Sequence, residues 1–181
     1  MNQYNISHKK AIEAIVWLSN KQPRIDIYHI VKIMFFADKM HINQYGRPLI
    51  GDTYIKMQYG PVPSAIHDLI TDSMWLSPRQ TKKISTSIKV GSKKEFYPVT
   101  ALRGADLSYF SKSDLKCLLE SFERYKDSSF DELYTLTHKE RCYIETTEKS
   151  PIDYALMIDD DNPNRDEIIN HISETSQYVQ V

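Results

Sequence analysis

The chain has 181 residues, of which 41% are hydrophobic and 26% are charged, and its formal net charge is −1. This length and apolar content suffice for one sizeable core and are small for two, so we expect a single domain. The near-zero charge provides no overall field that would draw the protein onto nucleic acid or anionic lipid, so polyanion binding would need a local patch.

The cysteines and the apolar segments indicate the compartment. Cys117 and Cys142 are isolated from one another, and no CxxC motif is present. The N-terminal residues MNQYNISHKK lack the apolar stretch of a signal peptide. The longest uninterrupted apolar run, IMFFA at residues 33–37, is far shorter than the roughly 18 residues of a membrane helix. We therefore expect a cytoplasmic protein with neither a disulfide framework nor a membrane span.

Two helices are expected at the N-terminal end. Ser7 can cap a first, amphipathic helix, and Pro23 ends it. A second helix can begin after the N-cap residue Asp26 and end near Tyr45, where Gly46 supplies the left-handed residue that closes many helices. This second helix is apolar around most of its circumference, which predicts that it lies at the centre of the fold.

A short strand is expected at residues 54–59, because the side chains alternate there. The apolar face would carry Ile55, Met57 and Tyr59. The opposite, polar face would carry Tyr54, Lys56 and Gln58. The sequence Gly-Pro-Val-Pro at 60–63 is most simply a rigid joint between this strand and a helix that starts at Pro63, and it does not fit a phosphate-binding loop.

A β-hairpin is expected at residues 84–99, with alternating side chains from Ile84 to Val90, a turn at 91–94 and a return strand at 96–99. No acidic residue occurs from Ser73 to Lys94. The basic residues of this stretch are Arg79, Lys82, Lys83, Lys89, Lys93 and Lys94. The simplest interpretation is that they protect an exposed strand edge from aggregation; contact with nucleic acid or an acidic partner is the alternative.

The C-terminal half predicts further helices. Two of them start at Ser111 with Asp114 and at Ser129 with Glu132, which are capping pairs, and a last one starts at residues 162–163. The fold class is therefore mainly α with a small antiparallel β element (α+β), as one compact domain in which a central apolar helix is packed by surrounding helices and a β-hairpin. Residues 1–160 would form this domain, and residues 161–181 a C-terminal helix and tail packed on it or appended to it.

The residues that could support catalysis are scattered: His29, Asp38, His41, Asp52, His67, Asp68 and His138. None belongs to an HExxH, GxSxG or nucleophilic-cysteine motif. His41 lies on the apolar stripe of its helix and is more simply a hydrogen-bonded core histidine, with Asp38 as its partner. We expect no enzyme and no catalytic, cofactor or metal site, and a metal-dependent hydrolase is the least favoured alternative.

Four short blocks follow one another in the first third of the chain: KIMFFA at 32–37, YG at 45–46, GD at 51–52 and YGPV at 59–62. They resemble the Panacea domain of SocA-like antitoxins, which typically has a Lys-Leu-Leu-Tyr-Phe-Ala helix, a Tyr-Gly stop, a Gly-Asp before a strand and a Tyr-Gly-Pro-Val turn. Further likeness at 110–115, 131–133 and 137–138 extends the resemblance over roughly residues 6–158. It departs after His138, where the family often has a tryptophan and this chain has Cys142-Tyr143.

The resemblance implies an antitoxin of a bacterial or phage toxin–antitoxin pair, which neutralises a cognate toxin from an adjacent gene by direct stoichiometric binding. It implies no catalytic residue. The matched residues have types that suit packing and tight turns, so we expect structural roles for them. They are Lys32, Phe36, Asp38, Gly46, Gly51, Asp52, Tyr59, Gly60, Pro61 and Val62.

A partner surface is expected on three exposed parts of the chain: the polar strand face (Tyr54, Lys56, Gln58), the basic hairpin (Lys89, Lys93, Lys94) and the tail (Tyr178). Tyr54 and Tyr178 rank above the lysines, because tyrosine is favoured at binding hot spots. The main alternative is a DNA-binding repressor of its own operon, which the basic hairpin suggests. Nucleic acid is thus a possible but not favoured partner, a homo-oligomer is possible, and no membrane partner is expected.

Overall fold

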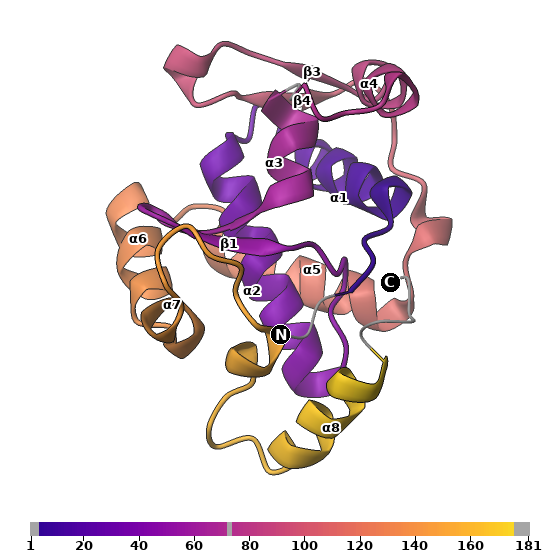
Figure 1. Ribbon diagram of the computed structural model, residues 1–181. Coiled ribbons are helices and arrows are strands. Elements are labelled where there is room, and N and C mark those ends of the chain that lie inside the picture. The colour runs from indigo at the N-terminus through magenta and orange to yellow at the C-terminus, as the bar shows by residue number, and fades with distance from the viewer. Residues whose placement is uncertain (1–3, 72–73, 176–181) are drawn as a thin grey trace.

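Helices make up most of the molecule, as the ribbon diagram of the computed structural model shows (Figure 1). The structure describes residues 4–71 and 74–175. The α-helices are α1 (His8–Lys21), α2 (Ile27–Tyr45), α3 (Ser64–Thr71), α4 (Pro78–Ser85), α5 (Lys112–Tyr125), α6 (Phe130–His138), α7 (Arg141–Glu145) and α8 (Arg165–Thr175). Three short 3-10 helices are η1 (Lys93–Glu95), η2 (Leu107–Tyr109) and η3 (Tyr154–Met157).

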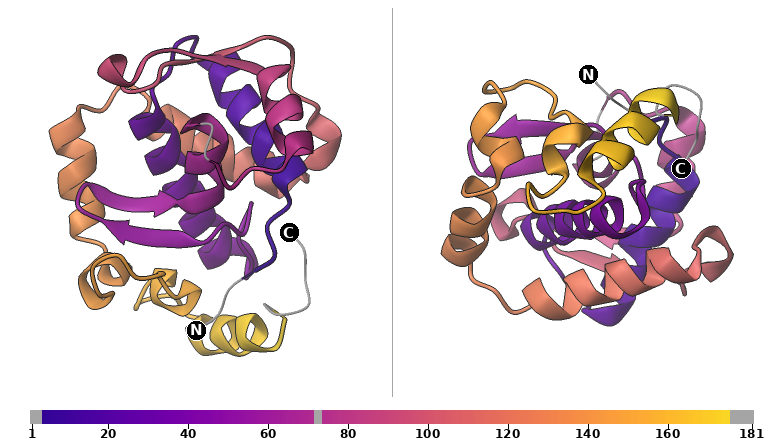
Figure 2. Two further views of the ribbon diagram at one scale, coloured as in Figure 1. Left: turned by 45° about the horizontal axis from the view of Figure 1, so that its top comes forward. Right: turned by 90° about the horizontal axis from the view of Figure 1, so that it is seen from below.

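The strands form two separate antiparallel pairs. One pairs β1 (Tyr54–Met57) with β2 (Gly60–Pro63), and the other pairs β3 (Ile88–Val90) with β4 (Val99–Ala101). The expected class, mainly α with a small antiparallel β element, is confirmed. The second pair lies with α4 at one end of the molecule, opposite α8 at the other end (Figures 1 and 2).

Helix α2 lies at the centre of the fold, as its apolar circumference predicted. Ile30, Ile33 and Phe35, on different sides of the helix, are all fully buried. The helix packs against α5 on one side and against strand β2 on another (Figure 2). Its ends are set locally: Asp26 Oδ1 accepts a 2.9 Å hydrogen bond from the His29 N–H, and Gly46 closes the helix with a φ of 72°.

The β1–β2 hairpin corrects two expectations. Residues 60–63 are not a joint between a strand and a helix, because they form strand β2, with Met57 opposite Gly60 and Tyr54 opposite Pro63. The expected alternation of buried and exposed side chains is also wrong: burial decreases along β1, from Tyr54, which is 1% exposed, through the half-buried Ile55 and Lys56 to Met57, which is 41% exposed. The reason is long-range, because residues 150–152 run alongside β1 and the phenol of Tyr54 reaches a buried carboxylate of α2.

The second hairpin begins later than expected. Ile84 belongs to α4 rather than to a strand, because Ser77 and Gln80 form a capping box and Pro78 occupies the first turn. The return strand is β4, at residues 99–101 instead of 96–99. Two consecutive aromatic residues in the connection, Phe96 and Tyr97, have left-handed backbones with φ of 57° and 52°.

The C-terminal helices start where capping residues predicted them. The capping boxes of Ser111 with Asp114 and of Ser129 with Glu132 are both formed. Helix α8 begins at residue 165, two to three residues after the expected start, and it contacts α2 and η3. None of the helices in the described segments is long and apolar enough to cross a membrane.

Gly60 makes a close approach that a larger residue cannot make. Its φ is +99°, and a Cβ at this position would lie 2.6 Å from Thr137 Oγ1 and 2.8 Å from Lys32 Nζ. We expect Gly60→Ala to lower the free energy of unfolding by about 2 to 4 kcal/mol, through backbone strain and overpacking. Urea denaturation measures the loss.

Gly104→Ala is the matched control for this substitution, because a Cβ there would meet no described atom within 4 Å. We expect this variant to change the free energy of unfolding by about 0.5 kcal/mol or less. Equal stabilities of the two variants would contradict the close packing of the β1–β2 hairpin against α2 and α6.

Candidate functional site

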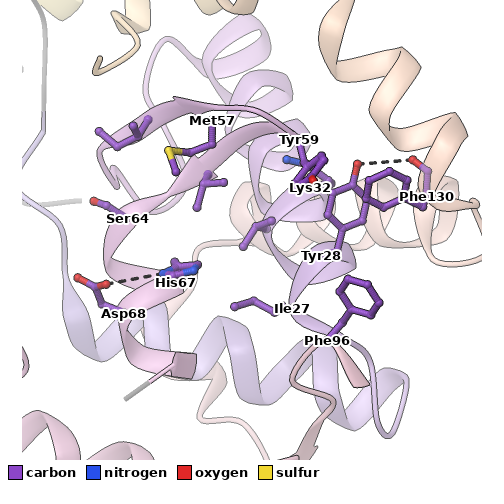
Figure 3. Close-up of a pocket in the computed structure, with 13 residues that line it drawn as sticks. Ile27, Tyr28, Lys32, Met57, Tyr59, Ser64, His67, Asp68, Phe96 and Phe130 are labelled. Carbon is purple, nitrogen blue, oxygen red and sulfur yellow. Dashed lines mark hydrogen bonds and ion pairs between the residues drawn. The ribbon is translucent and has the colours of Figure 1, made fainter. Parts of the chain in front are cut away.

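An open groove of about 680 Å³ lies between the N-terminal half of α2, the β1–β2 hairpin and α3 (Figure 3). Single aromatic residues from the β3–β4 connection and from α6 complete its lining. The aliphatic part of the lining consists of Ile27 and Val31 of α2 and Ile55 and Val62 of the hairpin. The volume and the apolar lining are typical of a site that takes up a ligand or a segment of a partner.

Large apolar side chains around the groove are open to solvent. Met57 and Phe130 are each 41% exposed, Tyr59 is 52% exposed and Phe96 is 63% exposed. They come from three places in the sequence, the β1–β2 hairpin, the β3–β4 connection and the start of α6, and line one groove. Clustered exposed apolar residues mark interaction sites more often than scattered ones do, and aromatic residues are favoured at binding hot spots.

Stacked rings hold one end of the groove in place. The Phe130 ring stacks on Tyr28 with a centroid distance of 4.5 Å and meets the edge of Tyr59 at 5.7 Å. The Tyr28 hydroxyl donates a 3.5 Å hydrogen bond to the Phe130 carbonyl. Burial, together with nearby acidic groups, raises the pKa of Tyr28 to about 12, so this hydroxyl stays a donor at neutral pH.

The α3 wall carries the polar groups of the groove. His67 Nδ1 and Asp68 Oδ1 lie 3.7 Å apart near its surface. Behind them, Asp52 accepts hydrogen bonds from the Ala65 and Ile66 N–H groups, at 3.0 and 2.9 Å, and thereby caps α3. Burial raises the pKa of Asp52 to about 6, although these bonds act in the opposite direction.

Lys32 of α2 is one of the groove-lining residues and is 0% exposed. Its Nζ donates a 2.9 Å hydrogen bond to the Pro61 carbonyl and lies 5.0 Å from the centre of the Tyr28 ring. No carboxylate among the described residues forms an ion pair with it. Burial lowers the pKa of Lys32 to about 7, because nothing nearby offsets the loss of water around the charge.

Asp38 fixes the hairpin wall, and its hydrogen-bond partners differ from the expected His41. It accepts hydrogen bonds from the Leu49 N–H at 2.6 Å, the Ile50 N–H at 2.9 Å and the Tyr54 hydroxyl at 2.6 Å. Burial raises its pKa despite these three bonds. The expected pairing of Asp38 with His41 is wrong, because the Asp38 carboxylate accepts its hydrogen bonds from these three donors instead.

His41 is a buried, hydrogen-bonded histidine with other partners. Its Nδ1 donates to the Arg47 carbonyl at 2.7 Å, and its Nε2 lies 3.1 Å from Asp114 Oδ1. Asp114 also pairs with Lys10 at 2.9 Å and with Arg47 at 3.0 Å. Burial opposes the charge of this carboxyl, but the hydrogen bonds from His41, Ser111 and Lys10 hold its pKa well below the usual range.

The structure places the expected partner residues on several surfaces. Tyr54 is buried, so it offers no surface to a partner, and the expectation of an exposed polar strand face is wrong for it. Lys56 is held by the Thr146 carbonyl at 2.8 Å and by the Tyr143 ring at 4.5 Å. Gln58 is exposed at the hairpin turn. Lys89, Lys93 and Lys94 are exposed on β3 and η1, and Tyr178 lies outside the described residues.

The family-matched residues, for which we expected structural roles, lie in the core or at the groove. Phe36, Pro61 and Gly51 are buried, and Gly51 has a φ of 73°. Tyr59 and Val62 instead line the groove. Sequence reasoning missed Met57, Phe96 and Phe130 as groove residues; the one available signal was the pair of large apolar residues, Met57 and Tyr59, beside the glycine of a tight turn.

The catalytic candidates do not converge. His29 is bound between Asp26 and the Ser128 carbonyl, and His138 between the carbonyls of Tyr134 and Gln58. Within residues 4–71 and 74–175, no group of three or more His, Cys, Asp and Glu side chains is placed to hold a metal ion. Burial raises the pKa of Cys117 to about 11 and that of Cys142 to about 12.

Basic side chains from two helices gather away from the groove. His8 and Lys9 at the start of α1 and Arg79 and Lys83 of α4 line a hollow of about 260 Å³. Lys83 Nζ also lies 3.9 Å from the buried Glu13 carboxylate. The six basic residues of the stretch 73–94 are divided between α4, β3 and η1.

Comparison with known proteins gives one match. The family model described as antitoxin SocA-like, Panacea domain, matches residues 30–143. This segment includes every groove-lining residue except Ile27 and Tyr28. No curated protein and no solved structure matches the chain.

Proposed function

This chain belongs to the family of SocA-like antitoxins with the Panacea domain, because the family model covers more than half of its length, and from this we propose that it neutralises a toxin encoded by an adjacent gene. Neutralisation would proceed by stoichiometric binding of the two proteins. Family membership suggests the toxin–antitoxin role and a non-enzymatic one; the direct binding and the surface involved are our proposal.

The groove between α2, the β1–β2 hairpin and α3 is the surface that we propose for toxin binding. The observation that carries this choice is the set of exposed side chains around it, Met57, Tyr59, Phe96 and Phe130. Covering them with a partner would remove apolar area from water, which is the main driving force of most protein association. Aromatic anchors in a concave site are also the usual carriers of binding energy.

The support beneath the groove favours a preformed site. Asp38 fixes the hairpin wall through three hydrogen bonds, and Asp52 fixes the start of the α3 wall through two backbone N–H groups. A site held in its binding geometry loses less conformational entropy on association than a mobile one. Binding would then inhibit the toxin by covering or distorting its active site.

Growth of cells that express the adjacent gene tests this proposal. We expect the neighbour to stop growth when expressed alone, and we expect growth to be restored when this chain is co-expressed. The two proteins should co-purify in a fixed ratio. A harmless neighbour, or toxicity that persists beside soluble, well-expressed chain, would remove the antitoxin role for that pair.

Binding to operator DNA is the second candidate. It is favoured by the basic side chains that α1 and α4 bring together, namely Lys9, Arg79 and Lys83. Binding to DNA phosphates is strongest at low salt. A mobility-shift assay on the promoter DNA of the operon should therefore show a complex at low salt that dissociates as the salt concentration is raised. The absence of any shift at low salt would count decisively against this candidate.

A further inference from the structure

Lys32 carries more hydrogen-bonding capacity than the free protein uses. An ammonium group has three N–H donors. One of them bonds the Pro61 carbonyl at 2.9 Å, and the Tyr28 ring lies 5.0 Å from the nitrogen. Among the described residues, no other acceptor is bonded to Nζ and no carboxylate pairs with it. The amine therefore lies beneath an apolar groove with donors to spare.

The free protein leaves the charge of this amine uncompensated. Burying a charge costs free energy unless the charge is paired, and the single hydrogen bond to the Pro61 carbonyl supplies no opposite charge. The other buried cation of the core, Lys10, is compensated by Asp114 at 2.9 Å. Lys32 has no such compensation, although its Nζ is as deeply enclosed. An anion supplied from outside would provide it.

The groove defines the rest of the ligand. Its aliphatic and aromatic lining requires apolar groups on either side of the anion, and its volume of about 680 Å³ accommodates several side chains. On the opposite wall, Asp68 Oδ1 lies 3.7 Å from His67 Nδ1, and no ion pair joins Asp68 to Lys32 among the described residues. Charge complementarity thus favours an acidic group embedded in an apolar sequence.

We propose that the occupant of the groove is a segment of the toxin in which apolar side chains flank a carboxylate, and that this carboxylate binds Lys32 Nζ. The inference rests on the proposed antitoxin function and specifies the chemistry of its partner. The amine is closed to solvent in the free protein, but the flexible four-carbon stem of lysine lets it turn toward the incoming carboxylate. A charge-assisted hydrogen bond then forms where water is excluded.

The binding should take up a proton at alkaline pH. In the free protein the pKa of Lys32 is about 7. A bound carboxylate favours the charged amine and raises this pKa, so below pH 7 the amine is ready to bind and the affinity is constant. Above that pH the free amine is neutral and must be protonated on binding, so the affinity falls by up to about tenfold per pH unit.

Two fluorescent dyes of the same ring system test the groove without the toxin. Anilinonaphthalene sulfonate is an apolar anion, and phenylnaphthylamine is its neutral parent. The wild-type chain should bind the anion about tenfold more tightly than the neutral dye near pH 6, and this preference should disappear as the pH rises above 7. The pH dependence of the dye preference is measured on the wild-type chain. It therefore shows whether the groove selects an anion even if a variant fails to fold.

Lys56→Met is the matched control for Lys32→Met. Lys56 also donates to a carbonyl, that of Thr146 at 2.8 Å, and also faces a tyrosine ring, that of Tyr143 at 4.5 Å, but it does not line the groove. Lys32→Met should abolish the preference for the anionic dye, and Lys56→Met should keep it. Equal preference in Lys32→Met and the wild type would overturn the inference.

His67→Gln tests whether the histidine of the α3 wall, rather than Lys32, causes the pH dependence. The other titratable residues lining the groove are Tyr28, Tyr59, His67 and Asp68, and histidine is the side chain that most often titrates in this range. The pH profile should survive His67→Gln. The opposite result would be a pH dependence that is lost in His67→Gln and kept in Lys32→Met. It would place the anion at the α3 wall and overturn the inference.

Calorimetry with the product of the adjacent gene completes the test. Lys32→Met should bind it about tenfold or more weakly than the wild type at pH 6.5 and with no dependence on pH, whereas Lys56→Met should behave as the wild type. Unchanged binding by Lys32→Met would overturn the inference while the antitoxin function stands. Failure of the wild-type chain to bind would reject the proposed function for that pair, and the dyes would still decide the chemistry of the groove.

Discussion

The Phe96→Asn variant is expected to bind the toxin about tenfold or more weakly than the wild type, and yet to be more stable by about 0.5 kcal/mol. Phe96 is 63% exposed at the groove, so removing its ring sacrifices little packing in the free protein. Its backbone has a φ of 57° and a ψ of 38°, a left-handed conformation that asparagine adopts at lower cost than phenylalanine. The loss of binding would therefore not come from unfolding.

The backbone bonds at this position do not depend on the side chain. The Phe96 carbonyl accepts from the Ile27 N–H at 3.0 Å, and the Phe96 N–H donates to the Lys93 carbonyl at 3.1 Å. Both bonds should remain in Phe96→Asn, so the connection keeps its course. An increase in the melting temperature together with a loss of growth rescue is the expected combination.

Ile144→Asn provides the control. Ile144 of α7 is also 63% exposed, and it does not line the groove. This variant should retain rescue and toxin affinity within about twofold, as expected for a surface substitution outside an interface. If Phe96→Asn rescued growth as well as Ile144→Asn did, the groove would not be the toxin-binding surface.

Asp38→Ala is expected to cause a large loss of stability. The substitution leaves three buried donors without an acceptor, namely the Leu49 and Ile50 N–H groups and the Tyr54 hydroxyl. Each buried, unsatisfied donor costs free energy, and we expect the free energy of unfolding to fall by about 3 to 5 kcal/mol in total. Denaturant unfolding followed by circular dichroism measures this loss.

Asp38→Asn separates hydrogen bonding from charge. Its amide oxygen can still accept from both N–H groups, and burial already raises the pKa of Asp38, so the neutral side chain loses little. We expect this variant to lose about 1 kcal/mol or less. A loss in Asp38→Asn as large as that in Asp38→Ala would show that the negative charge, rather than the acceptor oxygens, holds the hairpin wall.

The predictions concern two sets of residues in one site: those that support the groove and those that line it. Asp38 and Gly60 act beneath the groove, where they fix the position of the β1–β2 hairpin against α2. Phe96 and Lys32 act on the occupant itself. Substitutions of the first kind should lower stability and binding together, whereas Phe96→Asn should separate the two.

Local signals in the sequence determined most of the helices. The start of α5 follows from Ser111 and Asp114, and that of α6 from Ser129 and Glu132, because a capping box needs only residues three apart. Gly46 likewise ended α2 without any distant contact. The centrality of α2 was also readable, since an all-round apolar helix must be buried. The matched blocks in residues 32–62 further indicated the family.

Only the tertiary structure decided which side of β1 is buried and where the groove lies. Alternation has a period of two on either face, so it cannot say whether Tyr54 or Met57 points inward. That choice depends on Asp38 and on residues 150–152, which lie far along the chain. The groove likewise joins side chains from α2, the hairpin, α3, the β3–β4 connection and α6. Hydrogen bonds within one helical turn depend only on residues close in sequence. The burial of Tyr54, and the burial of Lys32 without a carboxylate partner among the described residues, arise only when distant segments pack together.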